Sequence, residues 1–345
     1  MKLLFFRCLF YIFPLFASCS KGTAKVPTQP IVNKDTVFFA KGADIGWLSQ
    51  MEKEGKLFYD ANGKQMDCIA LLKTKGINSI RLRVWVNPTA GYCGTADVIA
   101  QAKRAKALGM KIMIDFHYSD WWADPGKQNK PAAWTNLNFD ALASTVYTYT
   151  KDVVAQLKNN GITPTWIQIG NETNDGMLWE EGRASKNMSN FAILLKAGAR
   201  AVREVSASSK IIIHISNGYD NAMFRWMFDG LTNNKVDYDV IAMSLYPDAS
   251  NWQVTNNQCY QNMLDMVSRY GKEIMISEVG MDVTKAADCK NFLLDMIAKN
   301  KSLPNNKGLG VFYWEPECHN NWQGYNMGAF SNDGKPTIAM DAFLK

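Results

Sequence analysis

The sequence predicts an α/β fold, a single (β/α)8 TIM barrel with an open cleft at the C-terminal face of its strands. From residue 37 onward, short apolar and β-branched runs of strand length alternate with longer amphipathic runs. The alternation repeats eight times over about 300 residues, which favours a closed barrel over an open doubly wound sheet. No linker divides this region, so we expect one domain over residues 36–345.

The expected elements follow one another as strand and helix along the chain. Each strand is a short apolar run of the kind that is buried on both faces in a parallel sheet. The eight expected strands are Val37–Asp44, Ile77–Val86, Met110–His117, Thr165–Gly170, Lys210–Ser216, Val240–Tyr246, Glu273–Ser277 and Leu309–Trp314. Helices between them include Met66–Lys75, Ala96–Leu108, Phe139–Asn159, Phe191–Val205 and Cys289–Lys299.

The N-terminal residues are expected to form a targeting segment outside the barrel. Lys2 and Arg7 precede an apolar run of 10 residues, Cys8–Ala17, which is too short to span a bilayer and indicates a signal peptide over residues 1–18. The stretch Phe16–Cys19 resembles a bacterial lipobox, in which Cys19 becomes lipidated, and residues 19–35 read as a flexible tether. We therefore expect an exported protein, either an outer-membrane or cell-surface lipoprotein or a secreted or periplasmic one.

The composition allows a large core and argues against nucleic acid as a partner. Hydrophobic residues make up 47% of the chain and charged residues 20%, while the formal net charge is +6 without a basic block. No phosphate loop and no strand-linked G-x-G-x-x-G occurs, so we expect no nucleotide cofactor. No C-x-x-C spacing suggests a metal, and the five cysteines beyond Cys19 leave at least one thiol unpaired in a monomer, the expected state.

Polar residues follow the expected strands at the end where the active sites of such barrels form. The fourth strand ends at Asn171-Glu172 and the seventh at Glu278, and two carboxyl groups are the minimum equipment for cleaving a glycosidic bond. The other strand ends carry Asp44, Arg81, Arg83, Trp85, Asp115, His117, His214, Tyr246 and Trp314. Any one of these has a structural alternative: an arginine could close an ion pair, His214 could be a satisfied barrel histidine, and Trp314 could plug the barrel.

Two further features bear on the cleft. The loop Ser119–Asn138 is long and carries Trp121 and Trp122, so it is expected to build a wall with flat platforms for sugar rings. Alternation along the eighth strand turns Glu315 away from the barrel axis, which favours a structural ion pair for it. Asp115 faces the same way as His117 and is expected to orient it or Arg81.

Five stretches carry a resemblance to a known family. They are Lys41–Ile45 (KGADI), Gly76–Pro88 (GINSIRLRVWVNP), Ile114–Pro125 (IDFHYSDWWADP), Gln168–Glu172 (QIGNE) and Phe312–Pro316 (FYWEP). With these stretches the chain resembles the arabinogalactan endo-β-1,4-galactanases, glycoside hydrolase family 53, over nearly the whole domain. The resemblance implies a retaining endo-hydrolase that acts on galactan and needs no cofactor.

The resemblance also implies a role for each site residue. Glu172 would be the general acid/base and Glu278 the nucleophile, with Arg81 beside the nucleophile. Asn171 would contact the sugar 2-hydroxyl, Trp122 would be a stacking platform, and Trp314 would floor the subsite of the attacked sugar. The further cleft residues would be Asp44, His117, His214 and Tyr246, which are expected to contact substrate.

Two segments depart from the family pattern, and two rival functions stay open. Gly280–Asp288 is short and lacks an Asp/Asn-rich calcium site, so we expect no calcium there. Glu317–Gly328 looks individual, that is, it differs from the family pattern, so the resemblance does not define the sugar-binding subsites far from the cleaved bond or the length of the products. A β-mannanase or glucanase could use the same barrel and the same carboxyl groups, since fold does not fix substrate. A non-catalytic surface lipoprotein that captures glycan is the rival from another class, against which the presence of both Glu172 and Glu278 argues.

Overall fold

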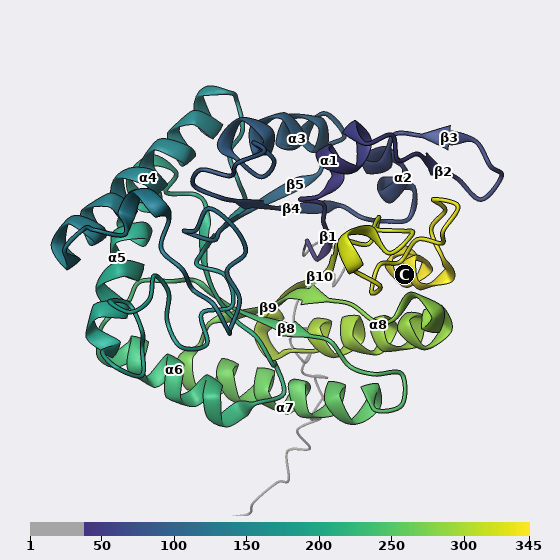
Figure 1. Ribbon diagram of the computed structural model, residues 1–345. Coiled ribbons are helices and arrows are strands. Elements are labelled where there is room, and N and C mark those ends of the chain that lie inside the picture. The colour runs from purple at the N-terminus through teal and green to yellow at the C-terminus, as the bar shows by residue number, and fades with distance from the viewer. Residues whose placement is uncertain (1–37) are drawn as a thin grey trace, which may run out of the picture. The chain divides into compact units, whose positions relative to one another are not determined.

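A computed structural model describes residues 38–345, and within them the chain forms a closed barrel of eight parallel strands surrounded by helices (Figure 1). The hydrogen-bonded order is β1-β10-β9-β8-β7-β6-β5-β4, and β1 pairs with both β10 and β4 to close the barrel. The strands are β1 (Ala40–Asp44), β4 (Ser79–Val84), β5 (Lys111–Phe116), β6 (Trp166–Ile169), β7 (Lys210–Ile215), β8 (Val240–Leu245), β9 (Glu273–Val279) and β10 (Gly308–Trp314). The predicted (β/α)8 barrel is confirmed.

Helices cover the outside of the barrel, and one short hairpin stands apart from it. The helices are α1 (Leu48–Lys53), α2 (Cys68–Thr74), α3 (Thr95–Ala107), α4 (Phe139–Asn159), α5 (Met188–Val205), α6 (Asn221–Asn233), α7 (Trp252–Tyr270) and α8 (Ala286–Lys301). The hairpin pairs β2 (Phe58–Tyr59) with β3 (Gln65–Met66). A 3₁₀ segment, Ile338–Leu344, ends the chain against α8.

Helix α2 shows why one expected boundary was wrong. The sequence pattern placed its start at Met66, but that residue pairs with Phe58 in the hairpin. The helix begins only after Asp67, whose carboxylate accepts a hydrogen bond from the Ala70 N–H at 2.9 Å and so satisfies one of the free donors of the first turn. Local capping chemistry therefore decided a boundary that hydrophobic periodicity could not.

The interior of the barrel is divided into an apolar layer and a polar layer. A buried cluster that includes Met113, Trp166 and Ala242 fills the lumen. Two residues further along the same three strands stand Asp115, Gln168 and Ser244, also buried. Because side chains two positions apart share one face of a strand, the lumen changes from apolar to polar toward the C-terminal ends of the strands. The site is built on that polar layer.

Two other expectations concern the ends and the thiols of the chain. The expected signal peptide, lipidated Cys19 and tether lie outside the described residues. Among residues 38–345 no helix combines the length and the apolar character needed to cross a bilayer. The five cysteines of this range are all buried and free: Cys68, Cys93, Cys259, Cys289 and Cys318.

Candidate active site

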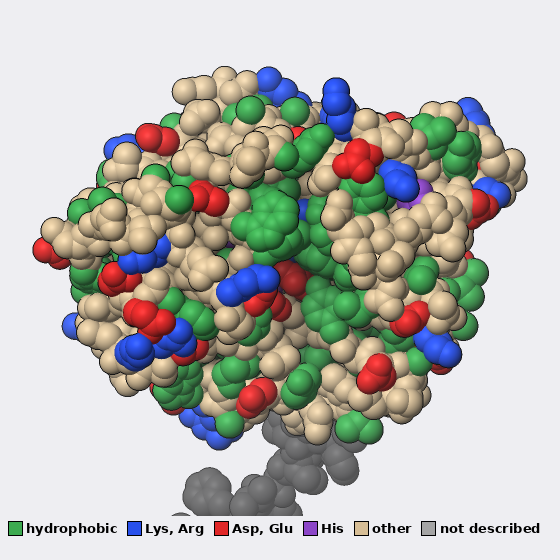
Figure 2. Space-filling view, in the orientation of Figure 1, with side chains coloured by type: hydrophobic (Ala, Val, Ile, Leu, Met, Phe, Trp, Pro, Cys, Tyr) green, Lys and Arg blue, Asp and Glu red, His purple; other side chains and the backbone are tan. Residues whose placement is uncertain are grey.

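A cleft of about 460 Å³ opens at the C-terminal face of the barrel. Figure 2 shows acidic side chains in a hollow at the centre of this face, with hydrophobic side chains on both sides. The lining residues are Trp47, His117, Trp122, Ala123, Asp124, Asn171, Glu172, Tyr246, Glu278, Trp314, Gln323, Gly324, Tyr325 and Met327. The cleft thus combines three carboxyl groups, those of Asp124, Glu172 and Glu278, with several aromatic rings, which suits a carbohydrate ligand.

Glu172 is carried into the cleft by a tight turn at the end of β6. Gly170 has a φ of 83°, and Glu172 itself has a φ of 43°, a left-handed conformation that is uncommon for a residue with a side chain. Its carboxyl group accepts a hydrogen bond from the Ser244 hydroxyl at 2.6 Å. Burial, followed by the charge of Glu278, raises the pKa of Glu172 to about 8. The group is therefore protonated at neutral pH and can donate a proton.

Glu278 lies near the end of β9 and is paired with a fixed positive charge. Its Oε1 lies 2.7 Å from Nη1 of Arg81, and its Oε2 accepts a hydrogen bond from the Tyr246 hydroxyl at 3.1 Å. Burial raises the pKa of Glu278, while the Arg81 guanidinium and the Tyr246 hydroxyl favour the ionised form. An ionised carboxylate with one oxygen held by Arg81 can attack an electrophilic carbon with the other.

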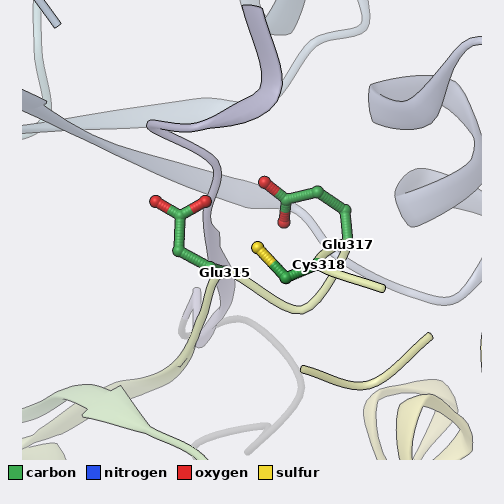
Figure 3. A group of neighbouring side chains, drawn as sticks. All are labelled: Glu315, Glu317 and Cys318. Atoms are coloured by element: carbon green, nitrogen blue, oxygen red, sulfur yellow. The ribbon is translucent and has the colours of Figure 1, made fainter. Parts of the chain in front are cut away.

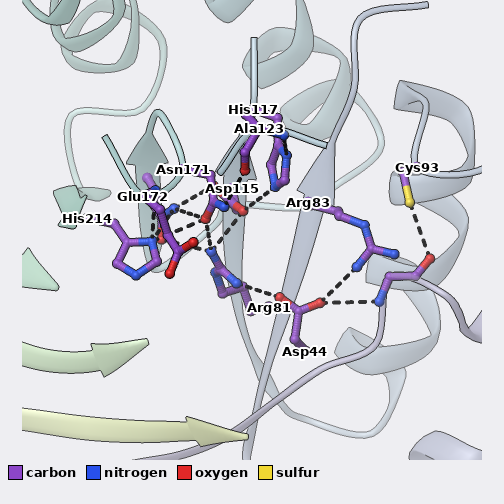
Figure 4. Close-up of polar contacts among 12 residues, drawn as sticks. Asp44, Arg81, Arg83, Cys93, Asp115, His117, Ala123, Asn171, Glu172 and His214 are labelled. Atoms are coloured by element: carbon purple, nitrogen blue, oxygen red, sulfur yellow. Dashed lines mark hydrogen bonds and ion pairs between the residues drawn. The ribbon is translucent and has the colours of Figure 1, made fainter. Parts of the chain in front are cut away.

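Arg81 is the centre of the polar layer beneath the cleft (Figure 4). Nη1 also contacts Asp44 at 2.7 Å, and Nη2 contacts Asp115 at 2.8 Å and the Asn171 side-chain oxygen at 2.8 Å. The guanidinium is fully buried, so these interactions are shielded from water and hold it rigidly. Arg81 thereby fixes Glu278 and Asn171 relative to each other.

His117 and Asp115 complete one side of this network. Nε2 of His117 lies 3.0 Å from Asp115, and Nδ1 accepts a hydrogen bond from the Ala123 N–H at 3.1 Å. Asp115 therefore contacts both Arg81 and His117, as expected from the alternation along β5. The Ala123 carbonyl in turn accepts a hydrogen bond from Asn171 at 2.9 Å, which ties the loop after β5 to the turn that carries Glu172.

A second chain of hydrogen bonds reaches Glu172 from below. Nδ1 of His214 lies near two donors, the Gln168 amide at 3.2 Å and the Glu172 backbone N–H at 3.4 Å, and near one acceptor, the Asn171 side-chain oxygen at 3.1 Å. The two donors favour the tautomer with the proton on Nε2, which then donates to Ser244 at 2.7 Å. Burial, and then the positive charge of Arg81, lower the pKa of His214 well below its usual range, which keeps the ring neutral. The Ser244 hydroxyl is thus turned toward the Glu172 carboxyl group.

Replacing Ser244 by Ala is expected to raise the pKa of Glu172, because the lost hydrogen bond favours the ionised carboxyl group. The alkaline limb of the kcat/KM profile should therefore move to higher pH, and kcat should fall about tenfold as Glu172 loses its fixed orientation. Ser216→Ala is a matched control, because Ser216 bonds Asn174 at 2.7 Å instead of Glu172. A profile that superimposes on that of the wild type would contradict this role for Ser244.

Aromatic rings form one wall of the cleft and pack edge to face. Ring centroids are 5.3 Å apart for Trp47 and Trp122, 5.2 Å for Trp47 and Trp314, and 4.7 Å for Trp314 and Tyr325. The Arg83 guanidinium lies behind them, 4.3 Å from the centre of the Trp122 ring. A Cβ at Gly46 would stand 2.3 Å from Nη1 of Arg83, so only glycine leaves room for this cation there.

Glu315 is confirmed as a structural ion-pair partner. It forms a close contact with Arg83 and accepts the Trp47 N–H at 3.2 Å. Its side chain is fully buried and does not line the cleft. The pair holds Arg83 under the tryptophans and thereby supports the wall.

The structure brings most of the expected site residues to one cleft but not all of them. The two carboxyl groups and five expected binding residues line it: His117, Trp122, Asn171, Tyr246 and Trp314. Asp44 and His214 differ from the expectation of substrate contact, because each is fully buried beneath the cleft and absent from its lining. Arg81 is also buried there and lies beside Glu278, as expected. All three hold the residues that do line it, and His214 follows the alternative of a satisfied barrel histidine.

The sequence reasoning did not single out several residues of the site. Ser244 could have been found, because it lies near the end of β8, two positions before Tyr246 and two after the lumen residue Ala242, whose face of the strand it shares. Trp47 and Tyr325 gave no such signal, since both lie in irregular segments whose path is set by tertiary contacts. Gln323–Met327 belongs to the segment that looked individual, and it forms part of the cleft lining.

Known proteins resemble this chain in sequence and in fold over nearly the whole domain. The family model described as Glycosyl hydrolase family 53 matches residues 40–343. The chain is 34% identical over 83% of its length to an endo-beta-1,4-galactanase of Bacillus subtilis, of which the match covers 71%. It is 33% identical over 88% of its length to an arabinogalactan endo-beta-1,4-galactanase of Thermothelomyces thermophilus, of which the match covers 98%.

A solved structure agrees with these relatives. The GH53 catalytic domain of Ignisphaera aggregans superimposes with a TM-score of 0.82 at 32% identity, and the match covers 91% of this chain and 97% of that one. The catalytic core of a xylanase A superimposes with a TM-score of 0.61 at 13% identity, which is a likeness of fold alone. With the family model matching nearly all of the barrel, the chain belongs to glycosyl hydrolase family 53 and is a glycoside hydrolase.

Proposed function

We propose that the enzyme cleaves internal β-1,4-galactosidic linkages of galactan and arabinogalactan by a retaining double displacement. The observation that carries this proposal is the pair Glu172 and Glu278, which face one cleft from β6 and β9 and differ in their polar partners. A carboxyl group kept protonated beside one held by a guanidinium is the division of labour that glycoside hydrolysis needs. The substrate is supported by the named activity of the relatives.

In the first displacement, an oxygen of Glu278 attacks the anomeric carbon as the bond to the leaving 4-oxygen breaks. Glu172 gives its proton to that oxygen, so the departing chain leaves as a neutral alcohol. The electron pair of the broken bond stays on the leaving oxygen, and the sugar becomes an ester of Glu278. Arg81 holds the other Glu278 oxygen at 2.7 Å and keeps the carboxylate aimed at the carbon.

In the second displacement, Glu172 acts as a base. Once Glu278 is esterified its negative charge is gone, and the charge that helped to raise the pKa of Glu172 is removed. The ionised Glu172 takes a proton from a water molecule, whose oxygen attacks the anomeric carbon. The bond to Glu278 breaks, its carboxylate is restored, and the sugar is released with its original configuration.

Incubation with linear galactan, mannan and carboxymethyl cellulose tests the substrate. We expect new reducing ends from galactan at a rate at least about 100-fold above that from the other two polymers. Proton NMR early in the reaction should show the β-anomer of the product before mutarotation, as retention requires. Faster release from mannan or cellulose would favour another endo-glycanase on the same barrel, and binding without release would favour a glycan-capturing protein.

The rate of galactan hydrolysis is expected to fall as the pH rises above about 8. Burial and the charge of Glu278 raise the pKa of Glu172 to about 8, so the proton that the first displacement requires is lost above that pH. On the alkaline side kcat/KM should decrease about tenfold per pH unit. A profile that stays flat to pH 10, measured on galactan with enzyme shown to be folded, would contradict Glu172 as the acid.

For localisation, the sequence supports export with a lipid anchor at Cys19. Metabolic labelling of the expressed full chain with a palmitate analogue should mark the wild type and leave Cys19→Ala unmarked. Export of an unlabelled wild-type protein would support simple secretion instead.

A further inference from the structure

A buried turn behind the aromatic wall carries three potential metal ligands. Glu315, Glu317 and Cys318 each offer one ligand atom, and these atoms lie within 4.8 Å of one another. Figure 3 shows the Cys318 sulfur between the two carboxyl groups. All three side chains are buried, and none of them lines the cleft.

Glu317 gives the independent reason to look for a ligand there. Its side chain is fully buried, and neither carboxyl oxygen has a hydrogen-bond partner among the described residues. A buried carboxyl group without partners is costly, and nearly all buried polar groups in proteins are paired. Glu315 is different, because Arg83 and the Trp47 N–H satisfy it. Either a proton shared with Glu315 or a bound cation is needed to offset the charge of the Glu317 carboxylate.

The local charges favour a cation at this position. Nη1 of Arg83 contacts Glu315 and lies 3.5 Å from Asp44, and among the described residues the guanidinium forms no ion pair with Glu317, while its Nε and Nη2 have no hydrogen-bond partner. A cation among Glu315, Glu317 and Cys318 would meet the free carboxyl oxygens and balance the second carboxylate. The turn is also held by the backbone, with the Cys318 N–H donating to the Glu315 carbonyl at 3.2 Å.

We propose that Glu315, Glu317 and Cys318 form a structural zinc site in this enzyme. Two carboxylates and a thiolate are a ligand set that zinc accepts, whereas calcium and magnesium prefer oxygen ligands only. Ligand atoms around a tetrahedral zinc are about 3.3–3.8 Å apart, so donors now within 4.8 Å need to approach by about 1 Å. A water molecule is available for the fourth position.

The position of the site gives it a function. The ligands follow directly on β10, whose last residue Trp314 lines the cleft, and they precede the segment Gln323–Met327 of the same wall. The Ala329 N–H donates to the Pro316 carbonyl at 2.8 Å, which returns the chain to the turn after that segment. A metal at the turn would therefore fix both ends of the wall segment that looked individual in the sequence.

Metal analysis of the purified enzyme tests the proposal without relying on activity. We expect about one zinc per chain by mass spectrometry, and after removal by a chelator a rise in Tm of about 5 °C on adding zinc chloride. Cobalt in place of zinc should give a sulfur-to-cobalt charge-transfer band. Cys318→Ser should lose that band, while Cys259→Ser, a change at another buried cysteine, should keep it.

Several outcomes would overturn the site. They are a protein that binds no zinc and gains no stability from it, stabilisation by calcium chloride in place of zinc, and a cobalt band that survives Cys318→Ser. Glu317→Gln separates a metal from a shared proton between the two carboxyl groups. If Glu317→Gln loses zinc and has a lower Tm than the wild type, the metal is supported. If the wild type contains no metal and the Tm of Glu317→Gln is equal to or above that of the wild type, the shared proton is supported. If Glu317→Gln fails to fold, the zinc content of the wild type and the cobalt band of Cys318→Ser still decide.

Discussion

Replacing Glu278 by Ala is expected to lower the kcat for galactan by at least about 10⁴-fold, because no other group can form the bond to the anomeric carbon. Two other carboxyl groups line the cleft. Ser244 and the turn after β6 hold Glu172 in the position of a proton donor, and Asp124 pairs with Lys127 on the loop after β5. Asp44 and Asp115 are fully buried against Arg81 and cannot reach a sugar. Reducing-end release measured over hours gives the residual rate.

The matched control lies on the same strand. Glu273 begins β9 and pairs with Lys210 at the opposite end of the barrel, so Glu273→Ala removes a carboxyl group from β9 without touching the cleft. Its activity should stay within about twofold of the wild type. Azide added to Glu278→Ala can enter the space left by the carboxylate and attack a substrate with a good leaving group, giving a product of inverted configuration. A Glu278→Ala enzyme with substantial galactanase activity would remove the nucleophile assignment.

The sequence predicted the elements of this fold because periodicity and topology agree in a parallel barrel. Eight apolar runs with helices between them allow few arrangements, and each barrel strand overlaps an expected strand. Residues at the strand ends then converge by geometry, which is why Glu172 and Glu278 could be placed together from positions far apart in the chain. Boundaries such as that of α2 depended on a single side-chain cap and were not predictable from the pattern.

Which polar residues of the site reach the cleft could not be read from the sequence. Asp44, His117 and His214 all lie on barrel strands or directly after them, yet only His117 lines the cleft. The difference is depth, because Asp44 and His214 lie in the polar layer below and are covered by the side chains they support. Depth depends on strand stagger and on the loops above, and neither leaves a periodic signal. The aromatic wall adds Trp47 and Tyr325 from irregular segments for the same reason.

Replacing Glu172 by Gln is expected to lower the kcat for galactan by about 10³–10⁴-fold, since the leaving 4-oxygen of a sugar needs a proton to depart. An aryl galactoside with a good leaving group needs none, so its glycosylation rate should remain near that of the wild type. The second displacement still lacks a base, and stopped-flow should therefore show a burst of aryl alcohol followed by slow turnover. Gln can still accept the hydrogen bond from Ser244, which preserves the geometry of the turn.

The pH dependence of Tm shows whether Glu172→Gln is folded and whether Glu172 has a raised pKa in the folded wild type. Burial and the charge of Glu278 raise the pKa of Glu172 to about 8, above its value in an unfolded chain, so its favourable contribution is present at low pH and is lost as the pH rises toward 8. Glu172→Gln removes this titration, and its Tm should exceed that of the wild type by about 2–4 °C at pH 8 but not at pH 4. With the fold established in this way, equal losses on galactan and on the aryl galactoside would count against the acid role, because only proton donation separates the two substrates.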